Sequence, residues 1–208
     1  MRSSIPRLHV ITDETVQSRY THIELARLCI DAGADGIQYR EKRAKPPSEH
    51  VQSVIGMCRI CDNAGAKLIV NDFVEVAIRA NATAVHLGRT DESIQSARVR
   101  LPADTMIGGT ANSLDEALQV AKLDVDYLGV GPVFGTTSKT SPAPPLGIAA
   151  LREICQRIEK PVIAIGNIQL QNVASVQAAG AHGVAVLSAI CCAKDVSQAT
   201  REFCEILA

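Results

Sequence analysis

The stretch Tyr127-Leu-Gly-Val-Gly-Pro-Val-Phe-Gly-Thr-Thr-Ser-Lys139 joins an apolar strand directly to a polar loop. Residues 127–130 form an apolar run of strand length, and Gly131-Pro132 ends regular structure there. Three hydroxyls and one lysine then follow at 136–139. Hydroxyl groups and an ammonium just past a strand suit an anion-binding loop, although a solvated polar connection would have the same composition.

The same order of strand, rim residues and helix recurs along the whole chain. Strands are expected, at a spacing of roughly 25 residues, at 8–12, 36–39, 67–70, 84–87, 106–107, 127–130, 161–165 and 183–187. Helical patterns alternate with them, at 21–32, 48–63, 73–79, 91–100, 113–123, 148–158, 172–179 and 195–207. This alternation predicts an α/β fold, a (β/α)8 TIM barrel formed as one domain by residues 1–208. A doubly wound open sheet is the alternative, but no early strand is followed by G-x-G-x-x-G.

Composition excludes several classes of function. The chain has 208 residues, 47% of them hydrophobic, no Trp, and a net charge of −1. An aliphatic core suits parallel strands covered by helices, and a chain without a basic block is not expected to bind nucleic acid. No segment reads as a signal peptide or a membrane span. The seven scattered cysteines indicate free thiols in a reducing cytoplasm. Both a monomer and a homo-oligomer are compatible with these features.

In a barrel of this type the active site lies at the carboxyl ends of the strands, so the residues just after each strand are the candidates. Gln38, Arg40 and Lys42 alternate after the second strand and are expected to point into the barrel. Two cations and an amide at this place suit a phosphate or a diphosphate, although a solvated charged loop end has the same composition.

Two carboxylates follow the neighbouring third and fourth strands, at Asp72 and Asp91. Carboxylates beside phosphate-binding cations indicate an Mg2+ site, because Mg2+ takes one or two carboxylates together with phosphate oxygens and water. For Asp91 the competing interpretation is a helix N-cap that opens the segment 91–100.

A second anion site is expected after the last two strands, at Gly166-Asn167 and Leu187-Ser188. Backbone N–H groups and a short extra helix, here near 189–192, hold phosphate at this place in many barrels. His86 lies on a strand among apolar neighbours and is expected to be structural. Two anion sites, one with a metal, and no strong base indicate group transfer from a diphosphate to an acceptor that carries a phosphate.

Six motifs, in order and over almost the whole chain, resemble those of the thiamine phosphate synthase/TenI family. They are Gln38-Tyr-Arg-Glu-Lys42, Val70-Asn-Asp72, His86-Leu-Gly-Arg-Thr-Asp91, Gly129-Val-Gly-Pro-Val-Phe-Gly-Thr-Thr-Ser-Lys139, Ala164-Ile-Gly-Asn-Ile168 and Gly183-Val-Ala-Val-Leu-Ser-Ala-Ile190. The resemblance implies small-molecule substrates: hydroxymethylpyrimidine diphosphate condenses with thiazole phosphate to give thiamine phosphate and pyrophosphate. It also implies a dissociative order, in which diphosphate leaves first and the thiazole nitrogen traps the pyrimidine cation.

The resemblance implies roles for individual residues as well. The pyrimidine diphosphate would be held by Gln38, Tyr39, Arg40, Glu41, Lys42, Asn71, Thr110 and Lys139, of which Arg40, Lys42 and Lys139 would be catalytic. Mg2+ would be held by Asp72 and Asp91. The thiazole phosphate would be held by Thr136, Thr137, Ser138, Gly166, Asn167, Leu187 and Ser188.

Departures from the family pattern bear on the function. Asn167 stands where the family usually has the second Gly of a pair, and Asn tolerates a positive φ better than most residues. Thr110 replaces Ser and Ser138 replaces Thr, which keeps both hydroxyls. In the thiazole tautomerases of the TenI branch a catalytic His falls at the position of Asn112. A TenI-like paralogue, either a tautomerase or a non-catalytic barrel that binds thiazole or thiamine phosphate, is therefore the second hypothesis after a synthase.

Overall fold

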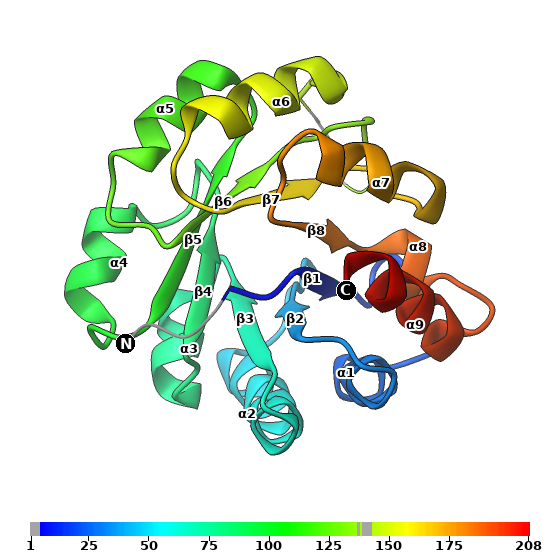
Figure 1. The fold of residues 1–208 in the computed structure, drawn as a ribbon. Helices are drawn as coiled ribbons and strands as arrows, with labels where there is room; N and C mark the ends of the chain where they lie inside the picture. Colours follow the sequence, from blue (N-terminus) through cyan, green and yellow to red (C-terminus); the bar gives the residue numbers. More distant parts are fainter. Residues whose placement is uncertain (1–4, 137, 139–142) are drawn as a thin grey trace.

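Eight parallel strands pair in sequence order, and the last pairs with the first to close a barrel (Figure 1). The structure is a computed structural model that describes residues 5–136, 138 and 143–208. The strands are β1 Leu8–Thr12, β2 Gly36–Tyr39, β3 Lys67–Asn71, β4 Ala84–Leu87, β5 Met106–Ala111, β6 Tyr127–Val130, β7 Val162–Ile165 and β8 Gly183–Val186. The predicted TIM barrel is confirmed.

Helices cover the outside of the barrel (Figure 1). They are α1 His22–Asp31, α2 Pro47–Ala64, α3 Val74–Ala80, α4 Ile94–Arg100, α5 Leu114–Ala121, α6 Gly147–Arg157, α7 Leu170–Ala178, α8 Ser188–Cys191 and α9 Val196–Leu207. Local signals set their ends. Thr21 and Glu24 form a reciprocal capping box that starts α1, and Gly65 ends α2 in the left-handed region at φ 69°.

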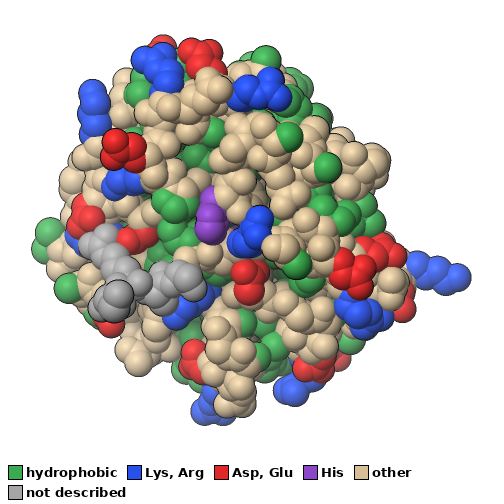
Figure 2. Space-filling view, in the orientation of Figure 1, with side chains coloured by type: hydrophobic (Ala, Val, Ile, Leu, Met, Phe, Trp, Pro, Cys, Tyr) green, Lys and Arg blue, Asp and Glu red, His purple; other side chains and the backbone are tan. Residues whose placement is uncertain are grey.

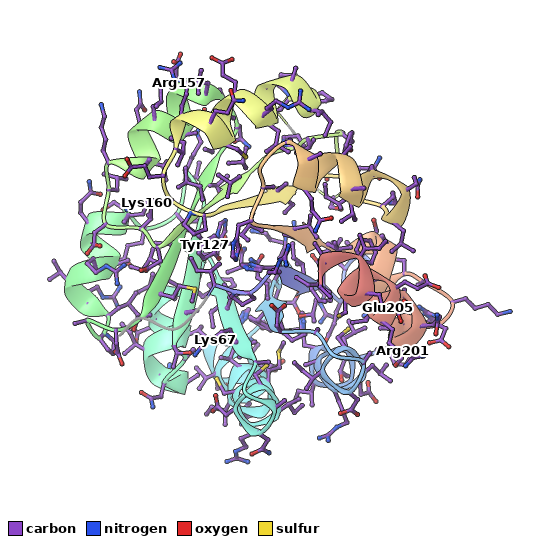
Figure 3. All side chains as sticks on the ribbon, viewed as in Figure 1. Lys67, Tyr127, Arg157, Lys160, Arg201 and Glu205 are labelled. Carbon is purple, nitrogen blue, oxygen red and sulfur yellow. The ribbon has the colours of Figure 1, made fainter. Side chains whose placement is uncertain are left out.

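Strand side chains alternate between two apolar layers, because successive residues of a strand point to opposite faces. The outer layer packs the strands against the helices. The inner layer fills the barrel and consists of Ile11, Ile69, Ala84, Met106, Tyr127, Ile163 and Ala185. Figure 3 shows Tyr127 toward the barrel centre, whereas Arg157, Arg201 and Glu205 lie on the outer helices. The polar residues that follow the inner layer along each strand therefore converge on the barrel mouth.

The fifth strand is longer than predicted. The sequence predicts an end at Gly108-Gly109, but β5 continues to Ala111. A Cβ on Gly108 would lie 2.5 Å from Nδ1 of His86 and would also collide with the Tyr127 ring. The glycine is there because two large side chains occupy the barrel interior beside it, so the prediction that it ends the strand was wrong.

The interpretation of Asp91 as a helix N-cap is also wrong. Helix α4 begins at Ile94, and the Ser93 side chain caps it by accepting a hydrogen bond from the Ser96 N–H. The Asp91 carboxylate instead accepts a hydrogen bond from the Gly88 N–H at 2.6 Å. The Asp91 carboxylate therefore takes no part in capping α4.

The surface charges, the helices and the cysteines of the described residues bear on the predictions made from composition. On the face drawn in Figure 2, Lys and Arg side chains alternate with Asp and Glu around the periphery. Within the described ranges, no helix combines the length and apolar character that a membrane crossing needs. All seven cysteines are free thiols.

Candidate active site

Arg40 lies at the barrel mouth, between β1 and the loop that follows β6. Its guanidinium forms an ion pair with the buried Asp13 carboxylate and donates a second hydrogen bond, at 3.1 Å, to the Ser138 carbonyl. Burial lowers the pKa of Arg40, and the negative charge of Asp72 opposes that lowering. The predicted residues Arg40 and Ser138, from two different substrate sets, are therefore in contact.

Lys42, Asp72 and Asp91 form a second group at the same end. The Lys42 ammonium donates to Asp72 Oδ2 at 2.5 Å. Burial raises the pKa of Asp91, and the neighbouring Asp72 carboxylate raises it further, while the Gly88 N–H and Lys42 act in the opposite direction. Because the Asp72 carboxylate is close enough to disfavour the charged form of Asp91, a divalent cation between the two groups would be stabilised there. The donor set, two carboxylates that face the barrel mouth beside a lysine, thus fits a hard oxygen-seeking ion such as Mg2+.

Gln38 and Asn71 line the interior side of the mouth. Both side chains are buried, and β1–β2 and β3–β4 pairing aligns Gln38 with Ile11 and Asn71 with His86. Ile11 belongs to the inner layer, so the predicted inward direction of Gln38 is consistent with this register. The amide groups are thus held by strands rather than by loops.

Thr110 comes from the end of β5, and its hydroxyl is hydrogen-bonded to His86 Nε2 at 2.9 Å. His86 Nδ1 is in turn 3.1 Å from the Tyr127 hydroxyl. The sequence interpretation treated His86 as structural, and it did not single out the Tyr127 side chain. Both prove to be connected to a predicted substrate-binding hydroxyl.

The ends of β6 and β7 are held together by backbone hydrogen bonds. The Val133 N–H donates to the Ile165 carbonyl at 2.8 Å, and the Phe134 N–H donates to the Gly166 carbonyl at 3.1 Å. Gly166 has φ 106° and Asn167 has φ 49°. Asn167 therefore adopts the left-handed backbone expected of it, and the loop after β6 is tied to the predicted phosphate site after β7.

The predicted phosphate-binding residues after β8 lie where the short helix α8 starts. Leu187 precedes α8, and Ser188 is its first residue. The part of Leu187 that is buried packs against the inner layer of the barrel. Thr136 and Ser138 are described on the loop after β6, whereas Thr137 and Lys139 lie outside the described residues.

Tyr39 and Glu41 have side chains on the helix side of β2, away from the barrel mouth. The Tyr39 hydroxyl is 2.8 Å from His50 Nδ1, in the outer layer. The buried Glu41 carboxylate is 2.6 Å from Lys45 Nζ and 2.6 Å from an Arg43 guanidinium nitrogen. The structure thus separates these two residues from Gln38, Arg40 and Lys42, with which they were predicted.

A further group of ligating side chains, Glu14, His22 and Glu41, brings three donor atoms within 4.8 Å of one another. Arg43 and Lys45 both form ion pairs with Glu14 and with Glu41. Their positive charges already compensate the two carboxylates, so the group acts as an ion-pair cluster around the buried Glu41.

Asp13 is the residue at the mouth that the sequence interpretation missed. It directly follows β1 and is fully buried, and its Oδ1 accepts hydrogen bonds from the backbone N–H and the hydroxyl of Thr15. Its position directly after β1 is the signal that could have identified it from the sequence.

Comparison with known proteins gives one consistent family. The family model described as thiamine monophosphate synthase matches residues 8–190. A thiamine-phosphate synthase of Salinibacter ruber is 43% identical over 96% of this chain and 88% of its own length. One from Methanoculleus marisnigri is 43% identical over 93% of this chain and 92% of its own. The solved structure of a thiamine phosphate pyrophosphorylase from Pyrococcus furiosus superimposes with a TM-score of 0.88 at 35% identity, covering 97% of this chain and 95% of that one.

Proposed function

Because the chain belongs to the thiamine monophosphate synthase family, we propose that it condenses hydroxymethylpyrimidine diphosphate with thiazole phosphate to give thiamine phosphate and pyrophosphate. The observation that carries the proposal is the convergence of Arg40, Lys42, Asp72 and Asp91 at one end of the barrel. Two cations and two carboxylates at a barrel mouth supply what a leaving diphosphate needs: positive charge, and ligands for the cation that accompanies it.

In the proposed reaction the C–O bond between the pyrimidine methylene and the diphosphate breaks, and its electron pair leaves with the diphosphate. The thiazole nitrogen then forms the new C–N bond. Arg40 and Lys42 bind the diphosphate and stabilise its growing charge, together with Lys139. Arg40 is held in place by Asp13, so its fork is oriented before the substrate arrives.

Asp72 and Asp91 are the residues that would hold Mg2+. The bound ion would neutralise part of the charge on the leaving diphosphate. Lys42 contacts Asp72 and therefore lies beside the same diphosphate. Gln38, Asn71 and Thr110 are proposed to hold the pyrimidine end of that substrate.

The second substrate, the thiazole phosphate, is proposed to bind between the loop after β6 and the ends of β7 and β8. Contacting groups there are Thr136, Thr137, Ser138, Gly166, Asn167, Leu187 and Ser188. The hydrogen bond from Arg40 to the Ser138 carbonyl supports this arrangement, because it brings the two substrate sets together. Tyr39 and Glu41 are proposed to contact the pyrimidine diphosphate only through the backbone of residues 38–42, since their side chains point to the helix side of β2.

Seven free thiols support a reducing cytoplasm as the site of the reaction. Cys29 and Cys58 have little tendency to ionise, because burial raises the pKa of each to about 11. A homo-oligomer stays a prediction.

The experiment that tests the proposal supplies the purified protein with both substrates and Mg2+ and measures thiamine phosphate. Omission of either substrate or of Mg2+ should abolish product formation. Isomerisation of the thiazole substrate without condensation would instead favour the TenI-like alternative. That alternative lacks support at its key position, because the Asn112 side chain donates to the Gly131 carbonyl and is a structural link between β5 and β6.

A further inference from the structure

A line of hydrogen-bonded side chains crosses the barrel interior from β6 through β4 to β5. The Tyr127 hydroxyl is 3.1 Å from His86 Nδ1, and His86 Nε2 is 2.9 Å from Thr110 Oγ1. The two rings are stacked, with their centroids 5.5 Å apart and an interplanar angle of 27°. This line ends at Thr110, which lies near the carboxyl end of β5, so a group deep in the interior is linked to a partly buried hydroxyl at the barrel mouth.

Two glycines leave the space that these rings occupy. A Cβ on Gly129 would lie 2.7 Å from Cε1 of His86, and one on Gly108 would lie 2.5 Å from its Nδ1. Real Cβ atoms do not approach other atoms this closely, so either substitution would displace the imidazole. The glycines on β5 and β6 therefore fit the His86 ring into one position between its two partners.

The proton of the Tyr127 hydroxyl determines the direction of the hydrogen bonds. Tyr127 is only 1% exposed, and burial raises its pKa, so the hydroxyl keeps its proton. A buried O–H that donates to nothing is costly. Among the described residues, the acceptor within hydrogen-bond distance of this hydroxyl is His86 Nδ1.

His9, on the other side of the Tyr127 ring, cannot reverse this direction. The two rings meet edge to face with their centroids 5.2 Å apart. His9 Nε2 is 3.2 Å from the Pro6 carbonyl and must donate to it. Burial lowers the pKa of His9 to about 3, so the ring is neutral and its Nδ1 is left as an acceptor. That nitrogen has no hydrogen-bond partner among the described residues, so the Tyr127 proton is not donated to His9.

We propose that Tyr127 and His86 fix the direction of the Thr110 hydroxyl, so that Thr110 acts as a hydrogen-bond donor to the ligand. When His86 Nδ1 accepts from Tyr127, the ring proton lies on Nε2 and is donated to Thr110 Oγ1. The Thr110 proton is then left to point away from His86. Tyr127 and His86 are positioning residues in this scheme, and Thr110 selects a ligand with an acceptor atom there.

The ligand class follows from this polarity and rests on the proposed function. An aromatic heterocycle with an unprotonated ring nitrogen, such as a pyrimidine, presents an in-plane lone pair that suits a single O–H donor. A ligand that places an N–H at the same point would leave two donors facing each other and would be rejected, because a buried polar group would stay unpaired. The line of side chains thus makes the site selective for one edge of the heterocycle.

The first test is the tautomer of His86 in the protein without substrates, read from 15N shifts and couplings of the imidazole nitrogens in 15N-labelled protein. The expected result is a proton on Nε2. In Tyr127→Phe, which removes the donor to Nδ1, that preference should weaken. A proton on Nδ1 in the unsubstituted protein would overturn the proposal, because Thr110 would then have to donate to His86.

The second test is kinetic. Thr110→Val and Tyr127→Phe should each raise KM for the pyrimidine diphosphate by about 2- to 12-fold, the equivalent of one hydrogen bond, and leave KM for the thiazole phosphate unchanged. Thr110→Ser keeps the hydroxyl and should stay close to the unsubstituted value. The matched control is Tyr20→Phe, because Tyr20 lines an outer groove with Leu28 and Val196. The proposal would be overturned if KM for the pyrimidine diphosphate, like KM for the thiazole phosphate, were the same in Thr110→Val as in Thr110→Ser.

The two tests also separate this proposal from the proposed function. The tautomer is measured on the protein alone, so an Nε2 proton together with no condensation would support the hydrogen-bond direction and refute the synthase activity. Full condensation together with an Nδ1 proton would do the reverse.

Discussion

Removing the Asp13 carboxylate should destabilise the fold through Arg40. Asp13 is fully buried, and the Arg40 side chain is 12% exposed, so Asp13→Ala would leave a guanidinium without its partner in a largely dry site. Breaking a buried ion pair from one side costs about 3–5 kcal/mol. For a chain of this size that loss lowers the midpoint of thermal unfolding by roughly 6–20 °C, at 2–4 °C per kcal/mol.

The assay is urea denaturation of Asp13→Ala, Arg40→Met and the double variant. Removing both charges should cost less than the sum of the two single losses, because the double variant buries no unpaired charge. Asp13→Asn keeps an oxygen for the Thr15 N–H, now 2.7 Å from Asp13 Oδ1, and should lose less than Asp13→Ala. Asp104→Ala, at an exposed carboxylate, is the matched control and should change stability by no more than about 0.5 kcal/mol.

A loss below about 1 kcal/mol for Asp13→Ala, or additive losses in the double variant, would refute the reasoning. Either result would mean that Arg40 does not depend on Asp13 for its position. The claim that the fork is oriented before substrate binds would then fail as well.

Three further predictions concern Asp91, His22 and Tyr39. The pKa of Asp91 is raised, so without a divalent cation the folded chain takes up this proton at a higher pH than the unfolded chain. The free energy of unfolding should therefore rise as pH falls through that pKa. The Asp91→Asn variant should not show this rise in urea titrations. Burial lowers the pKa of His22 from 6.5 to about 4, so the unfolded chain binds this proton at a higher pH than the folded chain. The free energy of unfolding should therefore fall by about 3 kcal/mol as pH drops from 6.5 to 4. The same dependence on pH in His22→Gln would contradict this. Tyr39→Phe removes the hydrogen bond to His50 and should lower the free energy of unfolding by about 0.5–1.5 kcal/mol, whereas an unchanged value would show that this bond adds nothing.

Much of the fold could be predicted because each unit carries its own local signals. The capping box at Thr21 and the left-handed Gly65 mark helix ends without reference to the rest of the chain. The end of β5 could not be predicted in the same way. Gly108 is required by the Tyr127 and His86 side chains, which reach it only through the register of β4, β5 and β6.

Some residues of the candidate site could likewise be predicted from the sequence, whereas others depend on how the strands pair. Residues within three positions of a strand end, such as Arg40, Lys42 and Asp72, could be found because the fold places the carboxyl ends of the strands at one mouth. Tyr39 and Glu41 belong to the same sequence motif but alternate to the helix side, so a motif alone cannot separate the two faces of β2. The link from Tyr127 to Thr110 depends on the register of three consecutive strands, β4, β5 and β6, and no local pattern indicates it.

The most direct measurement of the central claim is the stoichiometry of the products. The purified protein, supplied with hydroxymethylpyrimidine diphosphate, thiazole phosphate and Mg2+, should release thiamine phosphate and pyrophosphate in equal amounts over many turnovers, and the Asp72→Ala variant should release neither while staying folded. Absence of thiamine phosphate under conditions in which a known synthase is active, or full activity of Asp72→Ala, would contradict the account.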